Sequence, residues 1–365
     1  MRFHFVNVVW GEEYTRTCVE VMLPALLSSG NLAHSALAGN ARFLFYTTPA
    51  DAERIAASSA FRRLSQLMEV EMLDLTEFRK VTGSAGMAKY RLMNACQGHA
   101  VLRANEANAA IVFLCPDLMV SDNLCKRLIE LADEGRTVVY VAGARLCLDG
   151  IQRELGERFA GAERAEYPGI APREMVRIAL RTLSRNSRSL FWDAADVTIR
   201  PNHLWWRVGE AGFFVRGFHL HPILVAPTVP GIIPVQSQDD DFVERACPDL
   251  SRYYFIGDSD ECSAFSMGPD DEFPLYQTPG RYSEEAIAAY VMGQPDIRPL
   301  HRRFPRHVLR FHAEDLDETW ASVEAESSQI LSRIYRLIAA NEPRGFSHAQ
   351  WTDIFHSRLR AGTGT

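Results

Sequence analysis

The sequence has 365 residues, of which 47% are hydrophobic and 23% charged, and its formal net charge is −7. These values are typical of a globular protein with a substantial core, and the acidic balance without a long basic run argues against nucleic acid or an anionic membrane surface as a partner. No apolar run approaches the roughly 18 residues of a membrane span. The N-terminus enters a strand pattern at once and lacks the cleavage site of a signal peptide.

The cysteines are scattered along the chain. There are seven of them, an odd number, and none forms a C-x-x-C pair. Most stand in apolar surroundings, which indicates reduced, buried thiols and a cytoplasmic protein. A structural zinc site is therefore not expected.

The first part of the chain alternates between strand and helix patterns. Strands are predicted at 3–10, 42–46, 70–75, 110–115 and 136–141, and helices at 12–27, from about 48 onward, at 87–107 and at 123–134. This alternation predicts an α/β fold with a mostly parallel, Rossmann-like sheet and right-handed crossovers, flanked by helices.

The second part of the chain has a mixed pattern. Residues 149–190 are predicted to be helical, 196–216 to form antiparallel strands and 253–257 a short apolar strand. Residues 265–310 are expected to wrap the surface, 313–340 to form a C-terminal helix and 361–365 to fray. We therefore expect an α/β domain over 1–265, with a helical insertion at about 150–190, and a segment over 266–365 that wraps the surface and ends in helices.

The stretch 110–122 is the centre of the functional prediction. A buried strand ends at Pro116-Asp117, and Asp122 follows shortly before a helix. Open α/β sheets present ligand-binding groups at the carboxyl ends of their strands, so a binding role is favoured for Asp117. Asp122 is equally well interpreted as a helix N-cap.

Two histidines form the second candidate. His219 and His221 alternate along a predicted strand, so both imidazoles would project from the same face. They are interpreted as a ligand site for a metal or an anionic diphosphate, against the alternative of satisfied core histidines.

Two acidic clusters and an aromatic pair remain. Residues 258–261, D-S-D-E, follow an apolar strand and are either a site for a hard cation or a turn. Asp239, Asp240 and Asp241 could supply a catalytic base, or else form a solvated loop. Trp205 and Trp206 could stack against a sugar ring, or else belong to the core.

Several familiar signatures are missing from the sequence. There is no G-x-x-x-x-G-K-[ST] loop, no G-x-S-x-G elbow and no H-E-x-x-H helix, and W-G-E-E-Y follows the first strand in place of a dinucleotide glycine fingerprint. This argues against NAD or FAD as a cofactor.

At 113–124, F-L-C-P-D-L-M-V-S-D-N-L, the sequence resembles the GT-A glycosyltransferases, in which an apolar strand ends in a D-x-D motif. The resemblance covers roughly residues 1–145 in pattern. It implies a GT-A-like fold in which the motif holds a divalent cation that neutralises the diphosphate of a sugar nucleotide. It also implies a donor site formed by Val8, Trp10, Thr47 and Asp117.

The motif departs from the family pattern at its first acid. Aligned this way, Asp117 is the second acid of D-x-D and Cys115 replaces the first, although Mg²⁺ and Mn²⁺ prefer oxygen ligands. Two alternatives follow. Either other side chains complete the metal shell, or the enzyme uses positive side chains in place of a metal. The candidate ligands are Asp117, Asp122, His219, His221, Asp258 and Asp260.

The resemblance predicts a glycosyltransferase that uses a nucleoside-diphosphate sugar as donor and a glycan or another hydroxyl compound as acceptor. The leaving diphosphate would be stabilised near Asp117 and the His219/His221 pair, with Asp239, Asp240 or Asp241 as the base. The alternatives are a nucleotidyltransferase that makes a sugar nucleotide and a catalytically silent binding or scaffold protein.

Overall fold

The computed structural model describes residues 1–81, 88–160, 169–235, 241–272, 276–342 and 345–361. Its centre is a seven-stranded sheet with the order β12-β6-β11-β4-β1-β2-β3. β11 is antiparallel to both of its neighbours, and the other pairs are parallel. The strands are β1 (Arg2–Val8), β2 (Ala41–Thr47), β3 (Glu69–Asp74), β4 (Ala109–Leu114), β6 (Val138–Val141), β11 (His221–Val225) and β12 (Tyr253–Phe255). The predicted fold class, a mostly parallel α/β sheet flanked by helices, is confirmed.

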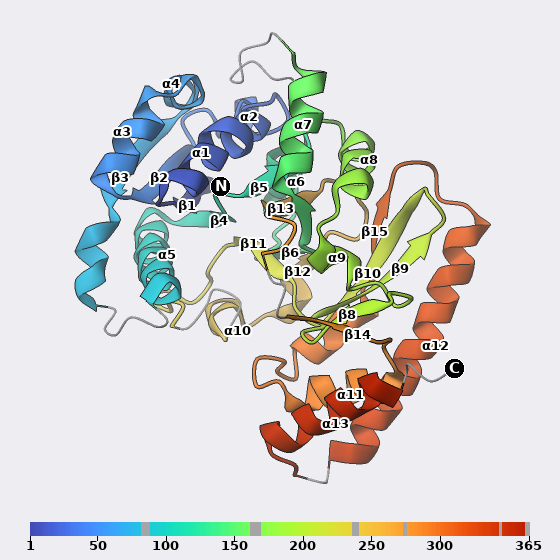
Figure 1. Ribbon diagram of the computed structural model, residues 1–365. Helices are drawn as coiled ribbons and strands as arrows, with labels where there is room; N and C mark the ends of the chain where they lie inside the picture. Colours follow the sequence, from blue (N-terminus) through green and yellow to red (C-terminus); the bar gives the residue numbers. More distant parts are fainter. Residues whose placement is uncertain (82–87, 161–168, 236–240, 273–275, 343–344, 362–365) are drawn as a thin grey trace.

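Both faces of this sheet are buried, which explains why its central strand is apolar throughout. In β4, Ile111 and Phe113 point into one hydrophobic core, whereas Val112 and Leu114 point into another. Figure 1 shows helices on both sides of the sheet. They include α1 (Glu12–Thr17), α2 (Leu23–Leu26), α3 (Pro49–Ala57), α4 (Ser59–Leu67), α5 (Ala88–Ala107) and α6 (Leu124–Asp133).

The predicted first helix has an irregular middle. Its α-helical ends, α1 and α2, are joined by the π-helical turn η1 (Cys18–Met22). The helical region predicted after residue 148 is confirmed as α7 (Leu148–Arg158), α8 (Pro172–Thr182) and α9 (Arg185–Arg188).

Three smaller sheets complete the structure. β5 (Leu118–Val120) and β7 (Ala144–Cys147) flank β13 (Ala264–Gly268). The antiparallel strands predicted within 196–216 include β9 (His203–Val208) and β10 (Gly212–Gly217), which pair with each other, and β10 also pairs with β15 (Leu309–His312). β8 (Asp196–Thr198) pairs with β14 (Gln277–Pro279).

The chain after residue 265 differs from its prediction. Residues 265–310 were expected to lie on the surface, but they contain β13 and α11 (Glu284–Gly293), and seven of the ten residues of α11 are buried. α11 packs against α12 (Glu318–Asn341) and α13 (His348–Ala361), as Figure 1 shows in its lower part. The domain boundary at residue 265 stays a prediction.

Among the helices that the structure describes, none combines the length and the apolar character that crossing a bilayer requires. The cysteines are all free thiols, and five of them are buried.

Candidate functional site

The candidate site lies where the strand order of the main sheet reverses. β1 lies beside β4, and the chain runs outward from β1 through β2 to β3, whereas the strands beyond β4 lie on the other side. In open α/β sheets, ligands bind in the crevice outside the carboxyl ends of the strands at such a point. Here these ends lead into residues 9–14 after β1 and 115–117 after β4.

Asp117 is held in a tight turn between β4 and β5. Leu118 N donates a hydrogen bond of 3.2 Å to Cys115 O, and Pro116 occupies the second position of the turn, which suits its fixed φ. The carbonyl oxygen of Asp117 accepts a hydrogen bond of 2.8 Å from Met267 N of β13. The turn and β13 therefore fix the backbone that carries the carboxylate.

The carboxylate of Asp117 faces Arg145 of β7. Asp117 Oδ2 lies 3.7 Å from Arg145 Nη2, and the same nitrogen donates a closer bond to Glu272 Oε2. The three side chains are 15%, 18% and 24% exposed, in the order Asp117, Arg145, Glu272, so the cluster is shielded but reachable from solvent. Burial raises the pKa of Asp117 above its ordinary value, and the positive charge of Arg145 acts against this increase. A carboxyl group perturbed in this way is typical of a functional site.

Tyr14, in the first turn of α1, lies beside this cluster. Its pKa is raised by burial and then by the negative charges of Glu272 and Asp117, while Arg145 lowers it. The phenol end of Tyr14 lies among these charges, but the residue as a whole is 43% exposed to solvent. An aromatic ring that is open to solvent beside charged groups offers a surface on which a planar or sugar ring could stack.

The sequence prediction missed Arg145, Glu272 and Tyr14. The rule that pointed to Asp117 would also have pointed to Arg145, because it follows shortly after the carboxyl end of β6. Tyr14 stands in W-G-E-E-Y after β1 and carried the same signal. Glu272 had no sequence signal, since its position depends on how the chain leaves β13.

His221 and His219 are separated by the structure. His221 is the first residue of β11 and pairs with Val141; because β11 runs antiparallel, this residue lies at the edge where β4 and β6 end. Its charge is one of those that lower the pKa of Asp117, so the two side chains share one neighbourhood.

His219 does not lie on that strand. The expectation of two imidazoles on one strand face is wrong, because His219 occupies a bend that precedes β11. Its carbonyl accepts a hydrogen bond from His203 Nε2, and its ring meets the ring of His301 edge-on at 6.3 Å. Burial lowers the pKa of His203 to about 4, so that ring stays neutral.

The residues expected to bind a nucleotide lie at the ends of β1 and β2. Val8 and Thr47 are buried, and Trp10 is half-buried against the core. Asp51 joins the two loops, because its carboxylate accepts hydrogen bonds from Gly11 N (2.9 Å) and Thr48 Oγ1 (2.7 Å). Burial opposes the charge of Asp51, but these bonds and Arg54 hold its pKa below the ordinary value. Nucleotide binding by Val8, Trp10 and Thr47 stays a prediction.

Asp122 makes a structural connection between distant segments. Its Oδ1 accepts hydrogen bonds from Ser28 Oγ (2.7 Å) and Gly30 N (2.8 Å), and its backbone N–H donates to Ile170 O (2.8 Å). The interpretation as a helix N-cap is wrong, because Asn123 precedes α6 directly and makes no side-chain cap bond.

One group among the described residues has the composition of a metal site. Asp258, Asp260 and His312 each place a potential ligand atom within 4.8 Å of the others. The sequence prediction named the two aspartates but missed His312, which lies at the end of β15. Asp117, Asp122, His219 and His221 do not belong to this group.

The charges of this group are balanced by protein contacts. His312 has a ring nitrogen 2.7 Å from an oxygen on each side, Nδ1 at Glu314 O and Nε2 at Asp258 Oδ1, and this arrangement favours the cationic ring, in which both nitrogens donate. The hydrogen bond to Asp258 raises the pKa of His312. Asp260 accepts hydrogen bonds from Arg173 at 2.8–3.1 Å, and Arg173 also contacts Asp315 at 2.6 Å.

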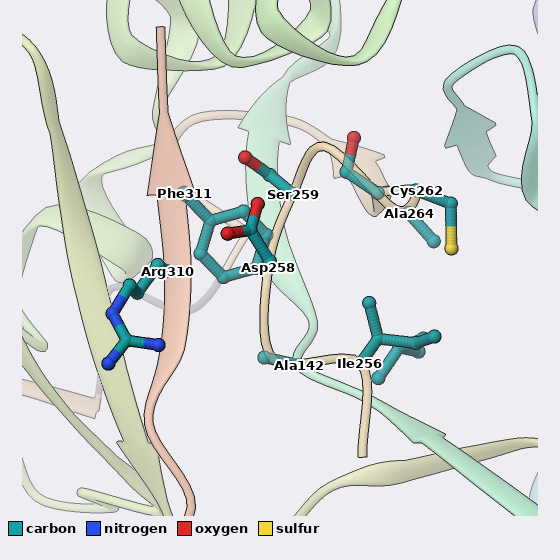
Figure 2. A pocket seen from close by; sticks show the side chains of 10 residues that line it. Ala142, Ile256, Asp258, Ser259, Cys262, Ala264, Arg310 and Phe311 are labelled. Carbon is teal, nitrogen blue, oxygen red and sulfur yellow. The ribbon is translucent and has the colours of Figure 1, made fainter. Parts of the chain in front are cut away.

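The strand that leads to this group and the strand that leads to Asp117 are not neighbours. β12, which leads to Asp258, is separated from β4 by three steps across the sheet, or about 14 Å at ~4.8 Å a step. Asp258, Ser259 and Arg310 are among the residues that line a cavity of about 10 Å³, and Figure 2 shows how these side chains lie. A cavity of that size has room for about one water molecule, so it is not a donor site.

The remaining candidates fall outside these clusters. Asp239 and Asp240 lie outside the described residues, and Asp241 precedes α10 (Phe242–Ala246) and pairs with Arg245 at 3.3 Å. Trp205 and Trp206 are buried, and each stacks on a phenylalanine of β10, so they belong to the core and not to a sugar platform.

No protein-family model matches the sequence, and no curated protein matches it. Among solved structures, the fold resembles Staphylococcus aureus TarS 1–349 at 12% identity and a TM-score of 0.36, over 92% of this chain and 71% of that one. Mouse xyloside xylosyltransferase 1 matches at 12% identity and a TM-score of 0.28, over 47% of this chain and 63% of that one. The galactosyltransferase LgtC matches at 14% identity and a TM-score of 0.24, over 44% and 52%.

This chain thus spans less than two thirds of the length of the last two proteins. Two of these structures are named as sugar transferases, a xylosyltransferase and a galactosyltransferase. The fold class itself rests on the strand order described above.

Proposed function

We propose that this chain is a glycosyltransferase that moves a sugar from a nucleoside-diphosphate sugar to a hydroxyl acceptor. The observation that carries the proposal is the cluster of Asp117, Arg145 and Glu272 outside the carboxyl ends of β1 and β4. This is the position at which open α/β sheets bind nucleotides and related ligands.

The chemistry of the transfer suits these groups. Breaking the bond between the sugar and the diphosphate develops negative charge on the leaving phosphate, and a fixed cation in a shielded site stabilises that charge. Arg145 supplies such a cation, because the planar fork of a guanidinium matches phosphate oxygens. The start of α1 is less suitable, since Glu12 and Glu13 occupy its first turn and Gly11 N is already bonded to Asp51.

The other roles follow from position. Asp117, which follows β4 and faces Arg145, would contact the donor. Tyr14 would stack against a ring of the donor. His221, at the same edge, would face the donor from β11. The base that an inverting reaction requires is proposed among Asp239, Asp240 and Asp241.

A divalent cation, Mn²⁺ or Mg²⁺, has its best fit at Asp258, Asp260 and His312. The Glu314 carbonyl fixes the ring orientation of His312 through Nδ1, an arrangement typical of metal-binding histidines, and leaves Nε2 directed at the two carboxylates. An ion bound there would present positive charge to an anionic ligand. It would replace the proton on Nε2 and compete with Arg173 for Asp260.

The test is turnover of a panel of sugar nucleotides by the full chain and by its variants. We expect Arg145→Met to lower the rate by roughly 10²–10³-fold, the cost of removing one charge-stabilising group, and Asp117→Ala to lower it through the loss of its contact with the donor. The control is Asp353→Ala, which removes an exposed acid on α13 and should leave the rate unchanged.

Three results would contradict the proposal. Turnover that survives Asp117→Ala and Arg145→Met would remove the cluster from the mechanism. Release of pyrophosphate from a nucleoside triphosphate and a sugar phosphate would identify a nucleotidyltransferase instead. Tight binding of sugar nucleotides without turnover on any acceptor would indicate a binding protein.

A further inference from the structure

Arg145 is shared between two carboxylates in this structure, and the closer one is Glu272. The Nη2 atom of Arg145 donates to Glu272 Oε2, whereas Asp117 Oδ2 lies 3.7 Å from the same atom. A guanidinium nitrogen that is occupied by Glu272 cannot at the same time donate to a phosphate oxygen in that direction. Glu272 therefore competes with any anionic ligand of this site.

The backbone of Arg145 is anchored on both sides. Its N–H donates to Ser187 Oγ at 2.8 Å, and its carbonyl accepts from Ser187 Oγ (2.8 Å) and Ser184 N (2.9 Å). α9 and its N-cap Ser184 thus fix the backbone from which the guanidinium extends, so the Arg145 backbone keeps its place when the partner of the guanidinium changes.

Glu272 lies on a short segment that follows β13, and hydrogen bonds of Asp270 hold this segment against α9. Asp270 Oδ1 accepts a hydrogen bond of 2.7 Å from Arg185 N, and its carboxylate lies 3.2 Å from Arg188 Nη2. Glu272 N itself makes a turn bond of 3.3 Å to Pro269 O. The tie at Asp270 allows the end of the Glu272 side chain to swing away while the segment keeps its place on α9.

The contact forms directly above Gly268, the last residue of β13. A Cβ atom at this position would lie 2.4 Å from Arg145 Nη2 and 2.3 Å from Glu272 Oε2. The two side chains therefore meet where any residue other than glycine would place its Cβ.

We propose, building on the proposed function, that Glu272 occupies the place of the donor diphosphate on Arg145 and leaves it when the donor binds. Glu272 places a carboxylate where the diphosphate would contact Arg145. A diphosphate that arrived with Glu272 still in place would meet like charges, which is unfavourable. Release of Glu272 leaves one arginine opposite the diphosphate, so the contact lowers the affinity for the donor and favours release of the diphosphate product.

The experiment measures the dissociation constants of UDP, GDP, CDP and ADP for the full chain by calorimetry, with and without Mn²⁺. We expect Glu272→Gln to tighten the binding of the preferred nucleoside diphosphate about tenfold, or about 1.4 kcal/mol, because a neutral amide competes less well than a carboxylate for the guanidinium. Arg145→Met should weaken binding, and adding Glu272→Gln to it should change nothing further, since the competition needs both partners.

Asp271→Asn is the matched control, because it removes the same charge from the neighbouring residue of the same segment. It should leave the dissociation constant within about twofold of wild type, as expected for an exposed charge. Melting temperatures of all variants establish that each is folded.

The outcomes separate the two proposals. If wild type binds a nucleoside diphosphate and Glu272→Gln binds it equally well or more weakly, the inference about Glu272 is overturned while the proposed function stands. If neither protein binds any nucleoside diphosphate, with or without Mn²⁺, the proposed function fails and this inference fails with it. An equal gain from Asp271→Asn would show a general charge effect and would also overturn the inference.

Discussion

Replacement of Arg216 by methionine would test how the C-terminal helices are attached to the rest of the protein. Arg216 lies in β10 and is 4% exposed. Its guanidinium donates to two carbonyl oxygens, Pro305 O (3.1 Å) and Arg306 O (3.3 Å), and to the hydroxyls of Ser327 (3.1 Å) and Ser328 (2.8 Å) of α12. The buried side chain of Arg216 thus holds both α12 and the turn that contains Pro305 and Arg306 against the β9–β10 hairpin.

The expected cost follows from the groups that lose a partner. The two serine hydroxyls keep their bonds to Glu324 O, but the two carbonyls lose the guanidinium, at about 1–3 kcal/mol for each unsatisfied buried group. Part of this loss is offset, because burial lowers the pKa of Arg216 and the charged form is itself disfavoured there. We expect a net loss of about 3 kcal/mol in the free energy of unfolding.

The assay is thermal and denaturant unfolding of wild type and Arg216→Met. With about 2.1 cal/mol/K of unfolding entropy per residue over 365 residues, a loss of about 3 kcal/mol lowers the melting temperature by about 4 °C. Arg303→Met, on the exposed side of the same turn, is the control and should shift it by less than about 1 °C. A loss below about 0.5 kcal/mol for Arg216→Met would refute the reasoning.

Three further predictions concern the candidate sites. Burial raises the pKa of Asp117, so the folded protein holds the proton of this carboxyl group more tightly than the unfolded chain does. The stability that the bound proton contributes is fully present below the unfolded pKa of about 3.9. It is lost as the pH rises through the folded pKa. The melting temperature of Asp117→Asn should therefore gain on wild type as the pH rises from about 4 to neutrality; a constant difference would contradict this. Mn²⁺ at about 100 times its dissociation constant should stabilise wild type by about 2.7 kcal/mol, and His312→Ala should lose most of this gain; equal gains would remove His312 from the ligand set. Tyr14→Ala should weaken nucleoside diphosphate binding by about tenfold, whereas Tyr14→Phe should retain it, because stacking needs the ring and not the hydroxyl; equal losses would refute stacking.

The strands of the main sheet could be predicted where the evidence for a strand lies in its own residues and in the turn that follows it. The run 109–114 is apolar on both faces because it lies in the middle of a covered sheet, and its end at Pro116 is a turn signal in the sequence itself. The pairing partners of β11 and β15 could not be predicted from the sequence. They are strands of five and four residues whose partners lie far away in the chain, and pairing of that kind is set by tertiary packing.

The site was predictable to the same extent. Asp117 and His221 were named from the sequence, the first because a strand ends there. Arg145 follows a strand end and carried the same signal, but its contact with Glu272 could not be predicted, because 127 residues separate the two and the contact depends on how two strands of a small sheet end side by side. His312 was missed for a similar reason, since it meets Asp258 across a separation of 54 residues.

Asp122 lies at a point where segments far apart in the sequence approach one another so closely that only glycine fits beside it. A methyl group on Gly30 would lie 2.5 Å from Asp122 Oδ1, and one on Gly169 would lie 2.6 Å from Asp122 Cβ. Neither glycine can gain a side chain while the aspartate stays, although they belong to segments far apart in the sequence. A smaller residue at position 122 would not make room for either change, because a methyl group on Gly30 would also lie 2.7 Å from Asn123 N and one on Gly169 would also lie 2.8 Å from Ser28 Cβ. In a library of random variants, Gly30 and Gly169 should therefore stay intolerant of substitution whatever residue stands at position 122.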